Sequence, residues 1–219
     1  MKTLLNRLLI MLCFISVKQI NAQAPLNGTI SYSSESISKM NFGGQELEQK
    51  MNMHLTQDFS GVYYRLSASL QNAPPGTGAG IKISGGPQMF QYYDPADKFL
   101  YQLQNFNGKN YALRYESKKI TGLVLTGKTQ TILGYACVEF TGIYFGEQAS
   151  GWYSTHLSSM VSPAGPLGLP GGLIRLESKK HKYIATEIKM GTAVKESDLQ
   201  LPKDAIKTTQ EEFDRIRTQ

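Results

Sequence analysis

Residues 62–70 read Val-Tyr-Tyr-Arg-Leu-Ser-Ala-Ser-Leu, and their alternation is the clearest indication of fold class in the chain. The apolar members of this run are Val62, Tyr64, Leu66, Ala68 and Leu70. A period of two is typical of a strand that turns one face to a core. A second alternating run begins at residue 50, and Gly61 supplies a turn between the two. Residues 50–70 therefore predict an amphipathic β-hairpin.

Strand-like runs recur on both sides of this hairpin at the spacing of antiparallel hairpins. The runs are residues 28–34, 98–103, 111–115, 131–133, 136–145, 151–157, 173–178 and 183–190. Asn107-Gly108 is a strong signal for a tight hairpin turn. One helix is indicated, at the C-terminus, where Thr209 and Glu212 have capping-box spacing.

About ten strands in one sheet curl rather than staying flat. We therefore expect a mainly β protein with a strongly curved antiparallel sheet or open half-barrel, followed by a short C-terminal helix. A β-sandwich is the alternative. No internal repeat or second domain is indicated, so the prediction is a single domain over residues 23–219.

Residues 1–22 have the pattern of a secretory signal peptide. Lys2 and Arg7 precede an apolar run over residues 8–17, which is too short to span a bilayer. Cleavage is expected near Ala22, with Ala24 as the alternative end of an A-x-A site. Cys13 lies inside the apolar run after bulky residues, which argues against a lipoprotein signal. The expected location is the periplasm of a bacterium, or the periphery of its outer membrane.

The charge balance argues against nucleic acid as a partner. The chain has 23 basic and 17 acidic residues, and three of the basic ones lie within residues 1–22. Removing these three leaves a net charge of +3, a weak field for a polyanion. Cys137 is the only cysteine after residue 22, so an intramolecular disulfide is excluded, and a small buried side chain is the expected role.

Two motifs that suggest chemistry have simpler interpretations. Residues 122–129 match the P-loop pattern G-x-x-x-x-G-K-[ST], but the next residues resemble a strand and not the helix that a phosphate site needs. Met51, Met53 and His54 could suit copper, yet on a strand His54 faces away from the two methionines. No hydrolase signature is present. We therefore expect a protein that is not an enzyme and has no metal or cofactor.

Three segments near the C-terminus share a recognisable order. Gly134-Tyr135-Ala136-Cys137 comes first, Trp152-Tyr153-Ser154 follows, and a proline- and glycine-rich stretch over residues 162–174 ends in Gly168-Leu169-Pro170-Gly171-Gly172-Leu173-Ile174. This order resembles the GLPGLI family, exported proteins of Bacteroidetes-type bacteria without a defined role. The resemblance covers about residues 131–177, with the signature loop at 165–174. One glycine follows the proline in the family motif and two do here, which predicts a bulge or a change of facing at Leu173 and Ile174.

The function expected from these patterns is non-catalytic binding of a hydrophobic ligand, or of an apolar segment of another envelope protein, in the curved sheet. The tentative binding residues are Trp152, Tyr153, Leu167, Leu169, Pro170 and Leu173. The alternative is a structural or partner-docking module whose apolar loop is simply core. A continuous cavity lined by Phe, Tyr, Met and Leu would favour the first, whereas a filled interior with Trp152 and Leu169 buried would favour the second.

Overall fold

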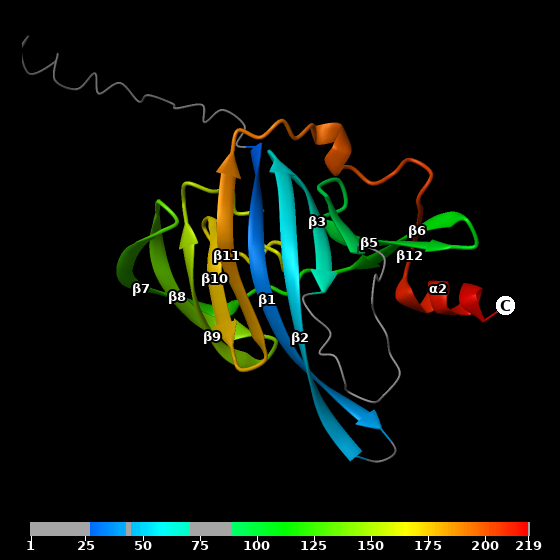
Figure 1. Cartoon of the computed structure of the whole chain (residues 1–219), viewed down its shortest axis with the longest axis horizontal. Coiled ribbons are helices and arrows are strands. Elements are labelled where there is room, and N and C mark those ends of the chain that lie inside the picture. The colour runs from blue at the N-terminus through cyan, green and yellow to red at the C-terminus, as the bar shows by residue number, and fades with distance from the viewer. Residues whose placement is uncertain (1–26, 43–44, 71–88, 219) are drawn as a thin grey trace, which may run out of the picture.

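A computed structural model of the chain describes residues 27–42, 45–70 and 89–218. The predicted signal peptide and its cleavage site lie outside these residues. Within them, one twelve-stranded sheet forms the protein, with little helix (Figure 1). Its strands are β1 (Asn27–Phe42), β2 (Gln45–Ser60), β3 (Tyr63–Leu70), β4 (Met89–Asp94), β5 (Phe99–Phe106), β6 (Lys109–Tyr115), β7 (Thr121–Ile132), β8 (Tyr135–Tyr144), β9 (Glu147–Ser154), β10 (Gly172–Ser178), β11 (His181–Met190) and β12 (Ile206–Thr208).

The strand order explains how the two halves of the sheet meet. The order is β12-β6-β5-β4-β3-β2-β1-β11-β10-β9-β8-β7, so β1 lies in the middle and β7 and β12 are the edges. From β1 the chain meanders outward to β6, crosses to the far edge at β7, and meanders back until β11 pairs with β1. All pairs are antiparallel except β12 with β6. The prediction of an open, mainly antiparallel sheet is confirmed, because the edges β7 and β12 do not pair with each other.

The β2–β3 hairpin has the predicted alternation. Tyr64 and Leu66 are buried on the inner face, and β3 pairs in register with β2. The prediction for Val62 was wrong: Gly61 and Val62 form the two-residue turn between β2 and β3, and Val62 is 49% exposed. The turn takes Val62 out of the strand because Gly61 has a positive φ of 59°, which starts a tight turn.

Three further hairpins close with two residues of positive φ, as mirror-image turns require. Asn107 and Gly108 make the predicted one, with φ of 50° and 73°. Leu133-Gly134 and Phe145-Gly146 make the other two, and each places a large apolar side chain at an exposed tip. The exposed Phe145 ring stacks on the imidazole ring of His181.

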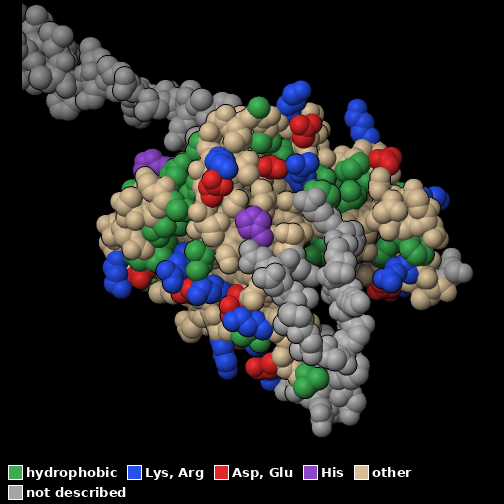
Figure 2. All heavy atoms as spheres, in the orientation of Figure 1, with side chains coloured by type: hydrophobic (Ala, Val, Ile, Leu, Met, Phe, Trp, Pro, Cys, Tyr) green, Lys and Arg blue, Asp and Glu red, His purple; other side chains and the backbone are tan. Residues whose placement is uncertain are grey.

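The outer face of the sheet is held by ion pairs. Lys50 pairs with Glu35 at 2.8 Å, and Glu177 accepts from both Arg175 and Lys182. Figure 2 views the molecule with β1, β2 and β11 in front, and acidic and basic side chains are interspersed over this face. No large field of one sign covers it.

The inner face is covered by the loop between β9 and β10, called here the β9–β10 loop (residues 155–171). Its apolar side chains Leu157, Val161, Leu167 and Leu169 are all buried. Hydrogen bonds to its backbone fix its path, including Ile120 N–H to the Leu167 carbonyl at 3.0 Å. The leucines of the proline- and glycine-rich stretch are therefore part of the core and not of a flexible linker.

The doubled glycine of the stretch lies beside a β-bulge. The β9–β10 register shifts between Leu173 and Arg175, so Ile174 is the extra residue. Leu173 consequently packs in one core cluster and Ile174 in the other. A Cβ on Gly171 would lie 2.1 Å from the Ser154 carbonyl oxygen, so only glycine fits where the loop enters β10.

After β11 the chain returns to the opposite edge. A 3-10 turn, η1 (Glu196–Leu199), precedes β12, and helix α2 (Gln210–Arg217) ends the fold. The predicted capping box is present: Thr209 accepts from the Glu212 N–H, and Glu212 accepts from the Thr209 N–H at 2.9 Å. Phe213 anchors the helix against the ring of Tyr111 on β6. Among the described residues, no helix has the length and apolar character needed to cross a membrane.

Candidate functional site

Two hollows on the inner face adjoin through shared lining residues and are together called here the inner groove. They have volumes of about 210 Å³ and about 480 Å³. Both are lined by Gln91, Tyr115, Pro163 and Tyr183, so these four residues join them. The groove therefore extends over residues from β2, β3, β4, β5, β6, β8 and β11, from the segments that follow β6 and β8, and from the β9–β10 loop.

The smaller hollow, called here the methionine end, is apolar. Its additional lining residues are Met53, Leu55, Leu66, Ala68, Met89, Phe90 and Gln102. They reach this place because alternation along β2 and β3 puts one side of each strand on the inner face. Met53, Leu55 and Leu66 are therefore the same residues whose alternation predicted the hairpin.

The larger hollow, called here the lysine end, mixes aromatic and charged side chains. Its additional lining residues are Leu100, Glu116, Lys118, Tyr144, Phe145, Ala164 and His181. His181 lies between two rings: Phe145 stacks on it with centroids 4.9 Å apart, and Tyr144 meets it edge to face. These ring contacts connect the β10–β11 hairpin, where β11 begins at His181, to the turn after β8.

The tyrosines of the groove are uncharged at physiological pH. Burial raises the pKa of the Tyr144 hydroxyl well above its ordinary value, and its hydrogen bond to Tyr183 raises it further. Burial likewise raises the pKa values of Tyr183 and Tyr115. Although 37% of Tyr115 is exposed, its hydroxyl lies near that of Tyr183 and is desolvated. The two tyrosines that line both ends of the groove, Tyr115 and Tyr183, are therefore uncharged.

His181 is held in its neutral form. Burial lowers its pKa, the nearby Glu147 carboxylate partly opposes this, and the Lys180 ammonium lowers it again. Its Nδ1 is buried and has no hydrogen-bond partner among the described residues. Among the described lining residues, Glu116 and Lys118 are accordingly the two that carry a charge near neutral pH.

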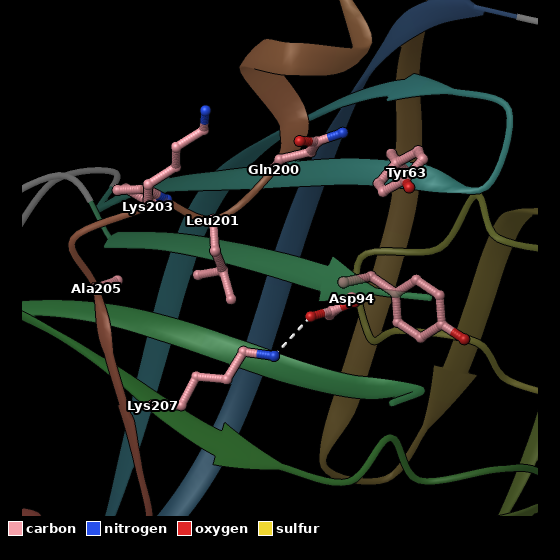
Figure 3. A pocket seen from close by; sticks show the side chains of 9 residues that line it. Tyr63, Asp94, Gln200, Leu201, Lys203, Ala205 and Lys207 are labelled. Atoms are coloured by element: carbon pink, nitrogen blue, oxygen red, sulfur yellow. Dashed lines mark hydrogen bonds and ion pairs between the residues drawn. The ribbon is translucent and has the colours of Figure 1, made fainter. Parts of the chain in front are cut away.

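A separate hollow of about 390 Å³ lies where the C-terminal segment crosses β4 (Figure 3). Lys207 on β12 reaches Asp94 at 2.7 Å and Asp97 at 2.9 Å, and the Tyr101 hydroxyl donates to Asp97 at 2.5 Å. Burial alone would lower the pKa of Lys207, but its bonds to the two carboxylates raise it well above its ordinary value. Burial would also raise the pKa of Asp97, yet hydrogen bonds from Tyr101 and Lys207 lower it.

These charges satisfy one another and fasten β12 to the turn between β4 and β5. A lysine engaged by two carboxylates is a poor nucleophile and a poor base, because both roles need its neutral form. The cluster around Lys207 therefore holds the C-terminal segment against the turn between β4 and β5. The inner groove is the stronger candidate site.

The six residues predicted to bind a ligand fall in different places. Tyr153, Leu167, Leu169 and Leu173 are buried together in one core cluster. Trp152 is half-buried against the other cluster, and Pro170 is exposed. None of the six lines the inner groove among the described residues, whereas Pro163 and Ala164, from the start of the same stretch, do.

The other motifs have structural roles. Residues 122–129 lie within the edge strand β7 and lead to another strand, and Lys128 pairs with Glu139 at 3.1 Å. Met51 and Met53 share one face of β2, and the neighbouring His54 points to the other. Among the described residues, no three His, Cys, Asp or Glu side chains are grouped to hold a metal ion.

Comparison with known proteins bears on the fold alone. No protein-family model and no curated protein sequence matches the chain. Among solved structures, PNGF-II in a C2 crystal form is similar, with 14% identity and a TM-score of 0.53 over 87% of this chain and 32% of that one. PNGF-II in a P21 form has 12% identity and a TM-score of 0.49, over 87% and 33%. The chain spans about a third of the length of PNGF-II.

Proposed function

We propose that this protein is a non-catalytic, exported envelope protein that binds a hydrophobic ligand in the inner groove. The observation that carries the proposal is the groove itself. The larger of its two hollows, of about 480 Å³, falls in the size range of small-molecule sites, the smaller adds about 210 Å³, and Met, Leu, Phe and Tyr make up most of the described lining.

The lining includes apolar surface that a bound ligand would shield from water. Met89 is 45% exposed although it borders Leu66 and Ala68, so apolar surface faces water in the unliganded protein. Covering such surface stabilises a complex by roughly 25 cal/mol per Å². Methionine side chains also adapt their shape, which favours a flexible apolar ligand over a rigid polar one.

Export is supported by the pattern of residues 1–22, and membership of the GLPGLI family by its three segments. The Gly-Tyr-x-Cys segment opens β8, Trp152 lies in β9, and the signature loop ends in β10. These strands are neighbours in the sheet, so the segments form one contiguous structural unit.

A partner-docking module is the second candidate. It is favoured by the burial of Leu167, Leu169 and Leu173, which leaves the signature loop a purely structural role. It is also favoured by the apolar side chains exposed at the β7 edge, among them Val124 and Leu125. In that case the bound species would be an apolar segment of another envelope protein.

Titration with Nile red, a neutral dye whose fluorescence rises in apolar surroundings, tests the proposal. We expect saturable binding that Met89→Lys weakens by about tenfold or more, because the variant places a charge in the apolar end. Leu125→Lys is the matched control, since Leu125 is similarly exposed on a distant strand. Equal dye binding by both variants would contradict the groove as the site.

Native mass spectrometry of the protein from the envelope, with lipid extraction and crosslinking, separates the two functions. A copurifying lipid supports ligand binding. One defined protein partner and no lipid would instead support the docking module.

A further inference from the structure

The inner groove differs chemically from one end to the other. At the methionine end, none of the described lining residues is charged. At the lysine end, Lys118 and Glu116 are exposed, and neither has an ion-pair partner among the described residues. A ligand that lies along the groove would thus have an apolar end near Met53 and Leu66 and a polar end near Lys118.

The charge around the lysine end is positive. Two acidic neighbours of the β10–β11 hairpin are already paired: Glu147 with Lys180 at 3.2 Å and Glu177 with Lys182 at 3.0 Å. Three lysines close by in sequence have no such partner among the described residues, namely Lys118, Lys119 and Lys179. Within the lining Glu116 offsets Lys118, so the excess of two positive charges comes from Lys119 and Lys179, which lie within two residues of the lining residues Lys118 and His181 in the sequence. An anionic group is therefore favoured over a cationic one at this end.

The size of the groove favours one chain. If a methylene group takes roughly the liquid volume of a water molecule, about 30 Å³, the methionine end holds on the order of seven methylenes. On the same scale the lysine end holds about sixteen groups, part of which the head must occupy. One chain of about 12 to 16 carbons fits, whereas the two chains of a phospholipid need about twice that room.

We propose that the ligand of the inner groove is a single-chain amphiphile with an anionic head, seated with its head at Lys118 and its chain toward Met53. This inference rests on the proposed function. It specifies the chemical class and the direction of a ligand that the proposed function leaves general.

Displacement of Nile red by three amphiphiles of equal chain length tests the charge of the head. The probes are tetradecanoate, tetradecanol and tetradecylamine, each used below its micellar concentration. We expect tetradecanoate to bind at least about fivefold more tightly than the alcohol, and the amine least tightly, with the preference shrinking as salt is added. Equal affinities for the three would overturn the inference.

Two lysine variants test the position of the head. Lys118→Gln should reduce the affinity for tetradecanoate to about that of the alcohol, whereas Lys119→Gln, the matched control, should retain most of the preference. An unchanged preference in Lys118→Gln would place the head elsewhere and overturn the inference. Tighter binding of a two-chain anionic phospholipid would overturn the single chain.

The two proposals fail in different ways. If Nile red binds but head charge has no effect, the anionic head is wrong and the apolar groove stands. If neither Nile red nor any amphiphile binds, both the proposed function and this inference are overturned.

Discussion

Replacing Leu169 with Ala tests whether the signature loop is part of the core. Leu169 is 4% exposed and packs with Tyr153, Leu167 and Leu173. Buried Leu→Ala changes cost 2–5 kcal/mol, and the cost is highest where the surroundings cannot collapse. The loop is fixed on both sides of Leu169 by backbone hydrogen bonds, so we expect a loss of about 3 kcal/mol in the free energy of unfolding.

Urea denaturation followed by tryptophan fluorescence measures this loss. Trp152 is the only tryptophan and packs at the neighbouring core cluster, so it reports on the same region. In thermal unfolding, a loss of this size lowers the midpoint by about 6–12 °C for a chain of this length. Leu125→Ala is the control, because Leu125 is 50% exposed and its removal should cost less than about 0.5 kcal/mol. Equal midpoints for the two variants would refute the burial of the loop.

Two further perturbations test the loop and the His181 site. Gly171→Ala should destabilise the protein strongly, because its Cβ would lie 2.1 Å from a backbone oxygen of β9; a denaturation midpoint equal to that of the wild type would contradict this. Burial lowers the pKa of His181 in the folded protein below its ordinary value of about 6.5. As the pH falls through about 6.5, the unfolded chain therefore takes up a proton at His181 before the folded protein does. Stability should therefore fall as the pH decreases through about 6.5, and His181→Phe should flatten that decline between about pH 7 and 5. A slope unchanged in the variant would assign the decline to other groups.

Local pattern predicted much of the sheet. Alternation identified the inner faces of β2 and β3, and Asn107-Gly108 and the Thr209 capping box marked a turn and a helix start that the structure contains. These features depend on a few neighbouring residues, which is why sequence alone reveals them. Pairing over a long distance was harder: only the end of β7 was predicted, and β12 was not predicted. β12 is three residues long and pairs in parallel with β6, which is almost a hundred residues away in the chain.

The candidate site was harder to predict because it depends on what the loop leaves uncovered. Alternation places Met53 and Leu66 on the inner face, but it does not tell which inner-face residues the β9–β10 loop will cover. Tyr115 and Tyr183 belong to strands on opposite sides of the sheet, and they meet at the groove only through the strand order. Four of the six tentative binding residues belong to the proline- and glycine-rich stretch, and three of these, Leu167, Leu169 and Leu173, are core.

The two parts of the proline- and glycine-rich stretch therefore have separate roles. Its later part, from Leu167 to Leu173, fills the inner face beside β8, β9 and β10, where a closed barrel would have opposing strands. Its first part borders the groove instead, where Pro163 forms a wall beside β2 and β3. The groove lies where the loop leaves part of the inner face of the open sheet uncovered. Changes in the later part should consequently alter ligand binding through the fraction of folded protein, whereas changes at Pro163 act on the groove directly.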